Sequence, residues 1–134
     1  MTSLATLPAF LGHFALAILL IAAGVALHTR LTPVNEWALV REGNAGAAIT
    51  LAGVILGLAM PLASAIAQSA GVVDALVWGV VALLAQQAAF LVCTRALLPD
   101  WRAAMVERGE VAGAVLKAAA AVGVGLLNAA CLVV

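Results

Sequence analysis

Long apolar runs alternate with short polar links along the chain. Four runs are long enough to cross a bilayer as a helix of about 20 residues, namely 10–27, 45–67, 75–94 and 111–133. Uninterrupted apolar runs of this length are typical of transmembrane helices. The pattern predicts an all-α fold: a polytopic membrane protein with four transmembrane helices in a single membrane domain, residues 1–134.

Composition agrees with this pattern. Of 134 residues, 66% are hydrophobic and 9% charged, with a mean hydropathy of +1.23, whereas soluble domains average about 45–50% apolar and about 25% charged residues. So few charges could not cover a water-exposed surface. The net charge is zero, and no basic cluster is present, which argues against binding to nucleic acid.

The basic residues indicate an orientation. Five of the six basic residues are arginines in the first and third links, Arg30, Arg41, Arg95, Arg102 and Arg108. The positive-inside rule places these two links in the cytoplasm and both termini in the periplasm of a bacterial inner membrane. The tryptophans fall near the ends of the predicted spans, as interfacial anchors do.

The two halves of the sequence resemble each other. The pattern of residues 41–57 recurs at 107–123 with constant spacing, and Thr29-Arg30 recurs as Thr94-Arg95. We expect two tandem two-helix repeats, about 9–68 and 75–134. Since each repeat has an even number of spans, both should point the same way across the membrane.

Each cytoplasmic link has a proline, a helix-capping residue (Asn35 or Asp100), a tryptophan and then a glycine that can stop a helix (Gly43 or Gly109). This order predicts a short interfacial helix in both links, with an irregular loop as the alternative. The residues that could contact a partner there are Asn35, Glu36, Trp37, Arg41, Asn44, Trp101, Arg108 and Glu110.

Small and polar residues share one face of the second predicted helix, and the third and fourth helices add polar groups. We call this set the polar seam: Thr50, Pro61, Ser64, Gln68, Gln86, Lys117 and Asn128. It could pack helix against helix or line a path for a solute, and Lys117 could instead extend to the cytoplasmic surface. The glycines expected to permit close helix packing are Gly53, Gly57, Gly113 and Gly125.

Catalytic and cofactor chemistry have little support in the sequence. His13 and His28 are about 22 Å apart along one helix, too far to hold one haem within a single chain. Cys93 and Cys131 should lie near opposite membrane faces, too far apart for a disulfide. We expect both thiols to be small buried side chains. No metal-ligand spacing and no nucleophile with a base is present, so we expect neither an enzyme nor a bound cofactor.

Specific motifs resemble a known family. Thr32-Pro33, Asn35-Glu36-Trp37, Gly43-Asn44, the 61–66 segment and Asn128-Ala129-Ala130-Cys131 are similar to the YjfL-type inner membrane proteins, a bacterial family of unknown function built of duplicated two-helix units. One departure is Glu110, which stands where the first unit has Asn44 and so argues against symmetric roles for the two junctions. The resemblance implies links to envelope-stress proteins and polyamine-related enzymes.

Two functional hypotheses follow from these features. The first is an oligomeric, non-enzymatic scaffold or anchor in the lipid bilayer, whose cytoplasmic links recruit a peripheral protein. The alternative is a homo-oligomeric channel or transporter for a small solute or ion, lined by the polar face of the second and fourth helices. A haem protein or membrane enzyme ranks well below both.

Overall fold

The computed structural model describes residues 4–32, 35–97 and 111–133. A single 3-10 turn, Leu4–Thr6, leads into α1 (Leu7–Leu31), which is followed by the short α2 (Glu36–Arg41) and by α3 (Ala45–Ala67). The remaining helices are α4 (Val72–Leu97) and α6 (Val111–Cys131). The four long helices coincide with the four predicted spans: α3 has the predicted bounds, α1 and α4 extend beyond their predicted ends, and α6 ends at Cys131, before the predicted end at 133.

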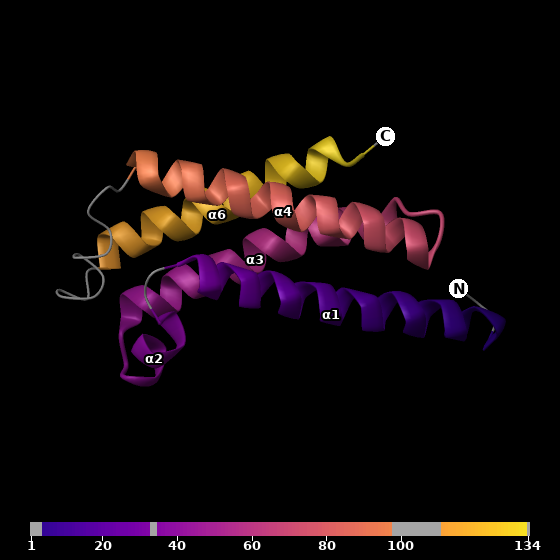
Figure 1. The fold of residues 1–134 in the computed structure, drawn as a ribbon, viewed down its shortest axis with the longest axis horizontal. Helices are drawn as coiled ribbons and strands as arrows, with labels where there is room; N and C mark the ends of the chain where they lie inside the picture. The colour runs from indigo at the N-terminus through magenta and orange to yellow at the C-terminus, as the bar shows by residue number, and fades with distance from the viewer. Residues whose placement is uncertain (1–3, 33–34, 98–110, 134) are drawn as a thin grey trace.

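The long helices form an elongated bundle (Figure 1). Both chain termini lie at one end of it, and α2 lies at the other; we call these the terminal end and the α2 end. α3 and α6 therefore run in the same direction, and the most extensive contact between any two described helices is theirs. α1 and α4 pack around this pair.

Local sequence explains how the chain turns between α2 and α3. The Asn35 side chain accepts a hydrogen bond from the backbone N–H of Ala38 at 3.1 Å and caps α2, and Asn44 caps α3 through the N–H of Ala47 at 3.0 Å. Between the two helices, Gly43 has φ +84°, a left-handed conformation that favours glycine. The predictions for Asn35 as a cap and Gly43 as a helix stop are confirmed; Asp100 and Gly109 lie outside the described residues.

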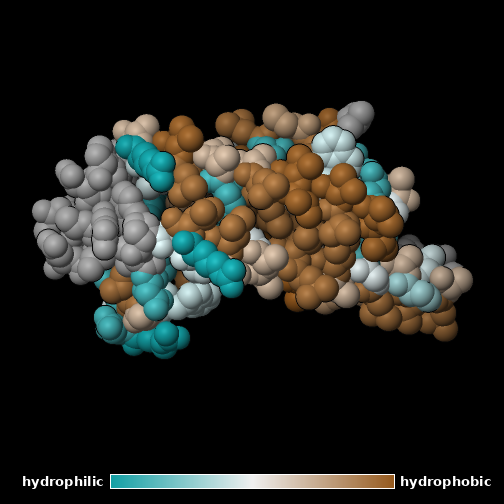
Figure 2. Space-filling model, in the orientation of Figure 1, coloured by the Kyte–Doolittle hydropathy of each residue, from teal (hydrophilic) through white to brown (hydrophobic). Residues whose placement is uncertain are grey.

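The apolar interior is built mainly from α3, with contributions from α1, α4 and α6. Its buried side chains form one cluster: Leu20, Val54, Leu58, Leu62, Leu83, Phe90 and Ala121. Large apolar side chains also cover much of the exterior, for example Leu19 and Leu56. In Figure 2 hydrophobic residues occupy the middle of the visible face, and hydrophilic ones gather towards the α2 end. Such an exterior suits contact with lipid tails.

Glycines let α3 and α6 approach to backbone distance. A Cβ added at Gly53 would lie 2.5 Å from Cα of Ala118, and one added at Gly125 would lie 2.5 Å from the carbonyl oxygen of Gly57. In a regular helix the carbonyl of Gly57 would accept from the N–H of residue 61, but Pro61 has no N–H. The freed carbonyl thus points at Gly125, where only a glycine leaves room for it.

Gly57→Ala should therefore destabilise the bundle. Its new Cβ would collide with the carbonyl of Ala121, and forcing an extra methyl into a filled contact costs about 1–3 kcal/mol. Unfolding followed by tryptophan fluorescence in mild detergent measures this loss. Gly123→Ala is the matched control on α6, since a Cβ there meets nothing within 4 Å; equal losses in the two variants would contradict this account of the helix contact.

Candidate functional site

The middle of the polar seam is closed by hydrogen bonds between helices. Gln86 Nε2 on α4 donates to the carbonyl of Ala121 at 2.9 Å, and Asn128 Nδ2 on α6 donates to the carbonyl of Ala82 at 3.0 Å. Ser64 Oγ on α3 donates to the carbonyl of Ala129 at 2.9 Å. These three side chains join α3, α4 and α6 to one another.

Other members of the polar seam are equally enclosed. Thr50 and Pro61 are buried in the contact between α3 and its neighbours. Gln87, next to Gln86, donates to the carbonyl of Gly24 at 2.8 Å and so ties α4 to α1. An unpaired polar group in hydrocarbon costs several kcal/mol. Since these hydrogen bonds satisfy the buried side chains, most of the polar seam serves to pack one helix against another.

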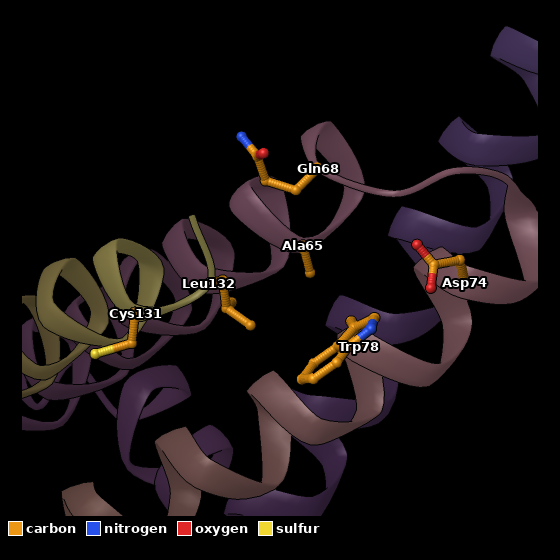
Figure 3. Close-up of a pocket in the computed structure, with 6 residues that line it drawn as sticks. All are labelled: Ala65, Gln68, Asp74, Trp78, Cys131 and Leu132. Carbon is orange, nitrogen blue, oxygen red and sulfur yellow. The ribbon is translucent and has the colours of Figure 1, made fainter. Parts of the chain in front are cut away.

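Gln68 lies apart from the rest of the seam. It is exposed at the terminal end of α3, beside a cavity of about 220 Å³ that Asp74, Trp78, Cys131 and Leu132 also line (Figure 3). The Asp74 carboxylate accepts from the backbone N–H of Ala70 at 2.9 Å, so it serves the turn before α4. Cys131 is exposed, which corrects the expectation that this thiol is buried.

Ionisable side chains gather in the interior of the α2 end. His28 Nε2 lies 3.2 Å from Glu36 Oε1, and the two side chains are only 1% and 0% exposed. When the imidazole is protonated, this contact is an ion pair. Glu36 stands at the first turn of α2, which packs against α3. Beside His28, Thr32 closes α1 with a hydrogen bond from its hydroxyl to the carbonyl of His28 at 2.8 Å.

Lys117 belongs to the same buried cluster rather than to the surface. Its side chain is 3% exposed, its Nζ lies 5.8 Å from the centroid of the Phe90 ring, and it interacts electrostatically with Glu36. The ring of His28 contacts Phe90 from another side, with centroids 5.5 Å apart. Of the alternatives left open for Lys117, extension to the membrane surface does not describe the structure, in which the side chain is buried beside Phe90.

Three buried polar atoms at this end have no hydrogen-bond partner among the described residues: His28 Nδ1, Glu36 Oε2 and Thr94 Oγ1. Buried polar groups are nearly always satisfied in folded proteins. Ionisable groups inside an apolar bundle are expensive, and they commonly mark functional sites. The cluster of His28, Glu36, Thr94 and Lys117 is accordingly the best candidate site in the described chain.

The residues predicted to contact a partner divide into three groups. Trp37, 43% exposed, and Arg41 are at the surface of α2. Asn35 and Asn44 cap helices, and Glu36 is fully buried, so its carboxylate does not belong to a contact surface. The remaining three lie outside the described residues: Trp101, Arg108 and Glu110.

The pairing of His28 with Glu36 was missed in the sequence. The sequence predicts that Glu36 belongs to a partner-contacting surface in the first cytoplasmic link, and it gives His28 no acidic neighbour. A signal does exist: the two residues flank Thr32-Pro33, where the proline ends α1 and a short link must turn the chain back. An ionisable residue on each side of such a turn can meet its counterpart, but their relative depth depends on how α2 packs.

The arrangement defines the class of protein. Four described helices are long and apolar enough to cross a membrane, spanning Leu4–Leu31, Ala45–Ala67, Val72–Ala96 and Val111–Cys131. The chain belongs to the family described as Domain of Unknown Function (DUF350), which it matches over residues 1–132.

Curated relatives agree with this assignment. The chain is 30% identical over 127 residues to the UPF0719 inner membrane protein YjfL of Escherichia coli (strain K12), covering 95% of each chain. The protein of the same name in Escherichia coli O157:H7 matches with the same identity and coverage. No solved structure matches the chain significantly. The relatives and the four apolar helices together support a multi-pass inner membrane protein.

Glu36→Ala should destabilise the protein by about 3 kcal/mol, because it leaves the charge of Lys117 buried without its acidic neighbour. Glu42→Ala is the matched control, since Glu42 is an exposed carboxylate at the other end of the same short helix and should change stability by less than about 0.5 kcal/mol. Unfolding in mild detergent compares them. Adding Lys117→Met to Glu36→Ala should recover part of the loss; simple additivity would show that the two charges are not coupled.

Proposed function

We propose that this protein is an oligomeric, non-enzymatic anchor in the inner membrane, and that its α2 end recruits a peripheral protein from the cytoplasm. The observation that carries the proposal is the closed polar seam. Gln86, Ser64 and Asn128 donate to backbone carbonyls of neighbouring helices, and these bonds favour a rigid bundle over a conduit. The polar surface that stays available is at the ends.

The α2 end offers the better recruitment surface. Trp37 is 43% exposed and Arg41 is exposed beside it, and tryptophan and arginine are the residues most enriched where partners bind strongly. The Asn35 cap and the buried Glu36 hold α2 in place, so these two side chains are presented from a fixed helix. A fixed surface loses less conformational entropy on binding than a loop does.

The proposal includes an orientation. The arginines of the first link lie at the α2 end, and the positive-inside rule assigns that end to the cytoplasm. Both termini, at the opposite end (Figure 1), would then be periplasmic. In this orientation α2 would lie at the cytoplasmic membrane interface, with Trp37 at the level of the headgroups.

The proposal also includes an internal duplication of a two-helix unit. Helices α3 and α6, the second helices of the two proposed units, run in the same direction and pack against each other, as a repeat axis along the membrane normal requires. Their contact surfaces have diverged: Gly57 is in close contact, whereas Gly123, its sequence counterpart, faces open space. The partners that the family resemblance implies, envelope-stress or polyamine-related proteins, remain part of the proposal.

Cysteine labelling tests the orientation. In a background without native cysteines (Cys93→Ala, Cys131→Ala), we expect a membrane-impermeant maleimide to label Gln68→Cys from the periplasm. Glu42→Cys should react only after the inner membrane is opened. Gln68 and Glu42 are both exposed, so a difference in labelling between the two variants reports the side of the membrane and not burial. The reverse pattern of labelling would overturn the orientation.

Photocrosslinking tests recruitment. A benzophenone amino acid placed at Trp37 in living cells should give adducts with a second protein, and Arg41→Glu should abolish them by reversing a surface charge. The matched control position is Trp78 at the terminal end, 47% exposed, where no such adducts are expected. Adducts confined to lipid, or the same protein adducts at both positions, would contradict recruitment at α2.

The transport alternative is favoured by one observation, the buried cluster of His28, Glu36 and Lys117, since ionisable groups inside membrane bundles often serve transport. In this alternative, several copies of the chain would surround a shared path. Native mass spectrometry in nanodiscs followed by a flux assay in liposomes separates the two functions: an assembly without flux supports the anchor.

A further inference from the structure

A second cavity lies at the α2 end, between the last turns of α1 and α4 and the first half of α6. Its volume is about 120 Å³, and its lining includes Thr32, Thr94, Arg95 and Lys117. The lining thus brings two cationic side chains and two hydroxyls together from three helices. None of the described residues that line it is acidic.

The two cations take different positions. Lys117 is buried and forms part of the wall, whereas Arg95 is exposed and can reach a group that enters from outside. The nearby carboxylate of Glu36 is in contact with His28 and offsets one of the two positive charges. Among the described residues an excess positive charge therefore remains at the cavity, and it attracts an anion.

The hydroxyl of Thr94 gives an independent indication of a ligand. Thr94 is 5% exposed and lines the cavity, yet its Oγ1 has no hydrogen-bond partner among the described residues. The other hydroxyl, on Thr32, already donates to the carbonyl of His28 at 2.8 Å. A bound anion could accept from Thr94 and satisfy it.

We propose that this cavity binds a phosphate group. Arginine and lysine both bind phosphate through charge-assisted hydrogen bonds, and a hydroxyl donor complements them. Leu31 and Leu91 extend the lining on its apolar side, with Leu31 46% exposed, so the cavity combines phosphate-binding and hydrocarbon-binding surfaces. That combination matches the headgroup and first acyl carbons of an anionic phospholipid; free phosphate shares the same chemistry.

Binding to the purified, delipidated full-length protein in a non-ionic detergent tests the site. Two probes are compared: phosphatidylglycerol, counted as bound lipid by native mass spectrometry, and inorganic phosphate, titrated by calorimetry. Thr94→Val, which keeps the shape of the side chain, and Arg95→Gln should each weaken binding by about tenfold. Arg30→Gln is the matched control, because it removes one exposed positive charge at the same end outside the cavity.

Each result has a defined meaning. If only phosphatidylglycerol binds, and the cavity variants weaken this binding while the control does not, the result supports the site with lipid as the source of the phosphate group. If binding of inorganic phosphate is weakened by the cavity variants in the same way, the result supports the site with a free anion as the source. No binding of either probe overturns the proposal, as does equal weakening by Arg30→Gln, which would indicate attraction to surface charge only. Unfolding measured for each variant separates lost binding from lost structure, and Arg95→Gln, at an exposed position, should fold normally.

Discussion

The approach of α3 to α6 at backbone distance is the constraint on which the rest of this structure depends. Gly53, Gly57 and Gly125 leave no side chain between the two helices, and in lipid, where the hydrophobic effect does not drive helices together, such contacts are a main source of association. Pro61 leaves the carbonyl of Gly57 without its intrahelical donor, and that carbonyl lies against Gly125. α4 and α1 then pack around a central pair whose spacing is fixed.

Polar side chains in this bundle act mainly as connections between helices. Four side chains each donate to a carbonyl on a helix other than their own: Gln86, Gln87, Ser64 and Asn128. A carbonyl already bonded within its helix can accept a second hydrogen bond, so these contacts satisfy the side chains without disturbing the helices. The polar residues that suggest a conduit in the sequence therefore make the bundle rigid. The candidate functional groups lie at the ends of the bundle.

The α2 end differs from the terminal end in holding charge inside. The contact of His28 with Glu36 couples the end of α1 to α2, and the electrostatic interaction of Glu36 with Lys117 extends this coupling to α6. The Phe90 ring is a neighbour of both His28 and Lys117. An anchor surface on α2 and a phosphate site beside Lys117 would thus share one buried carboxylate, that of Glu36.

The sequence by itself determined the membrane class, the four spans, the cap at Asn35, the stop at Gly43 and the family, because apolar run length, capping chemistry and left-handed glycine are local properties. It also identified Gly53, Gly57 and Gly125 as packing residues. Only the tertiary structure decided which polar groups meet. That Glu36 lies inside with His28, that Lys117 packs on Phe90, and that the seam is closed all depend on helix rotation and depth, which residues distant in the chain set together and no local pattern encodes.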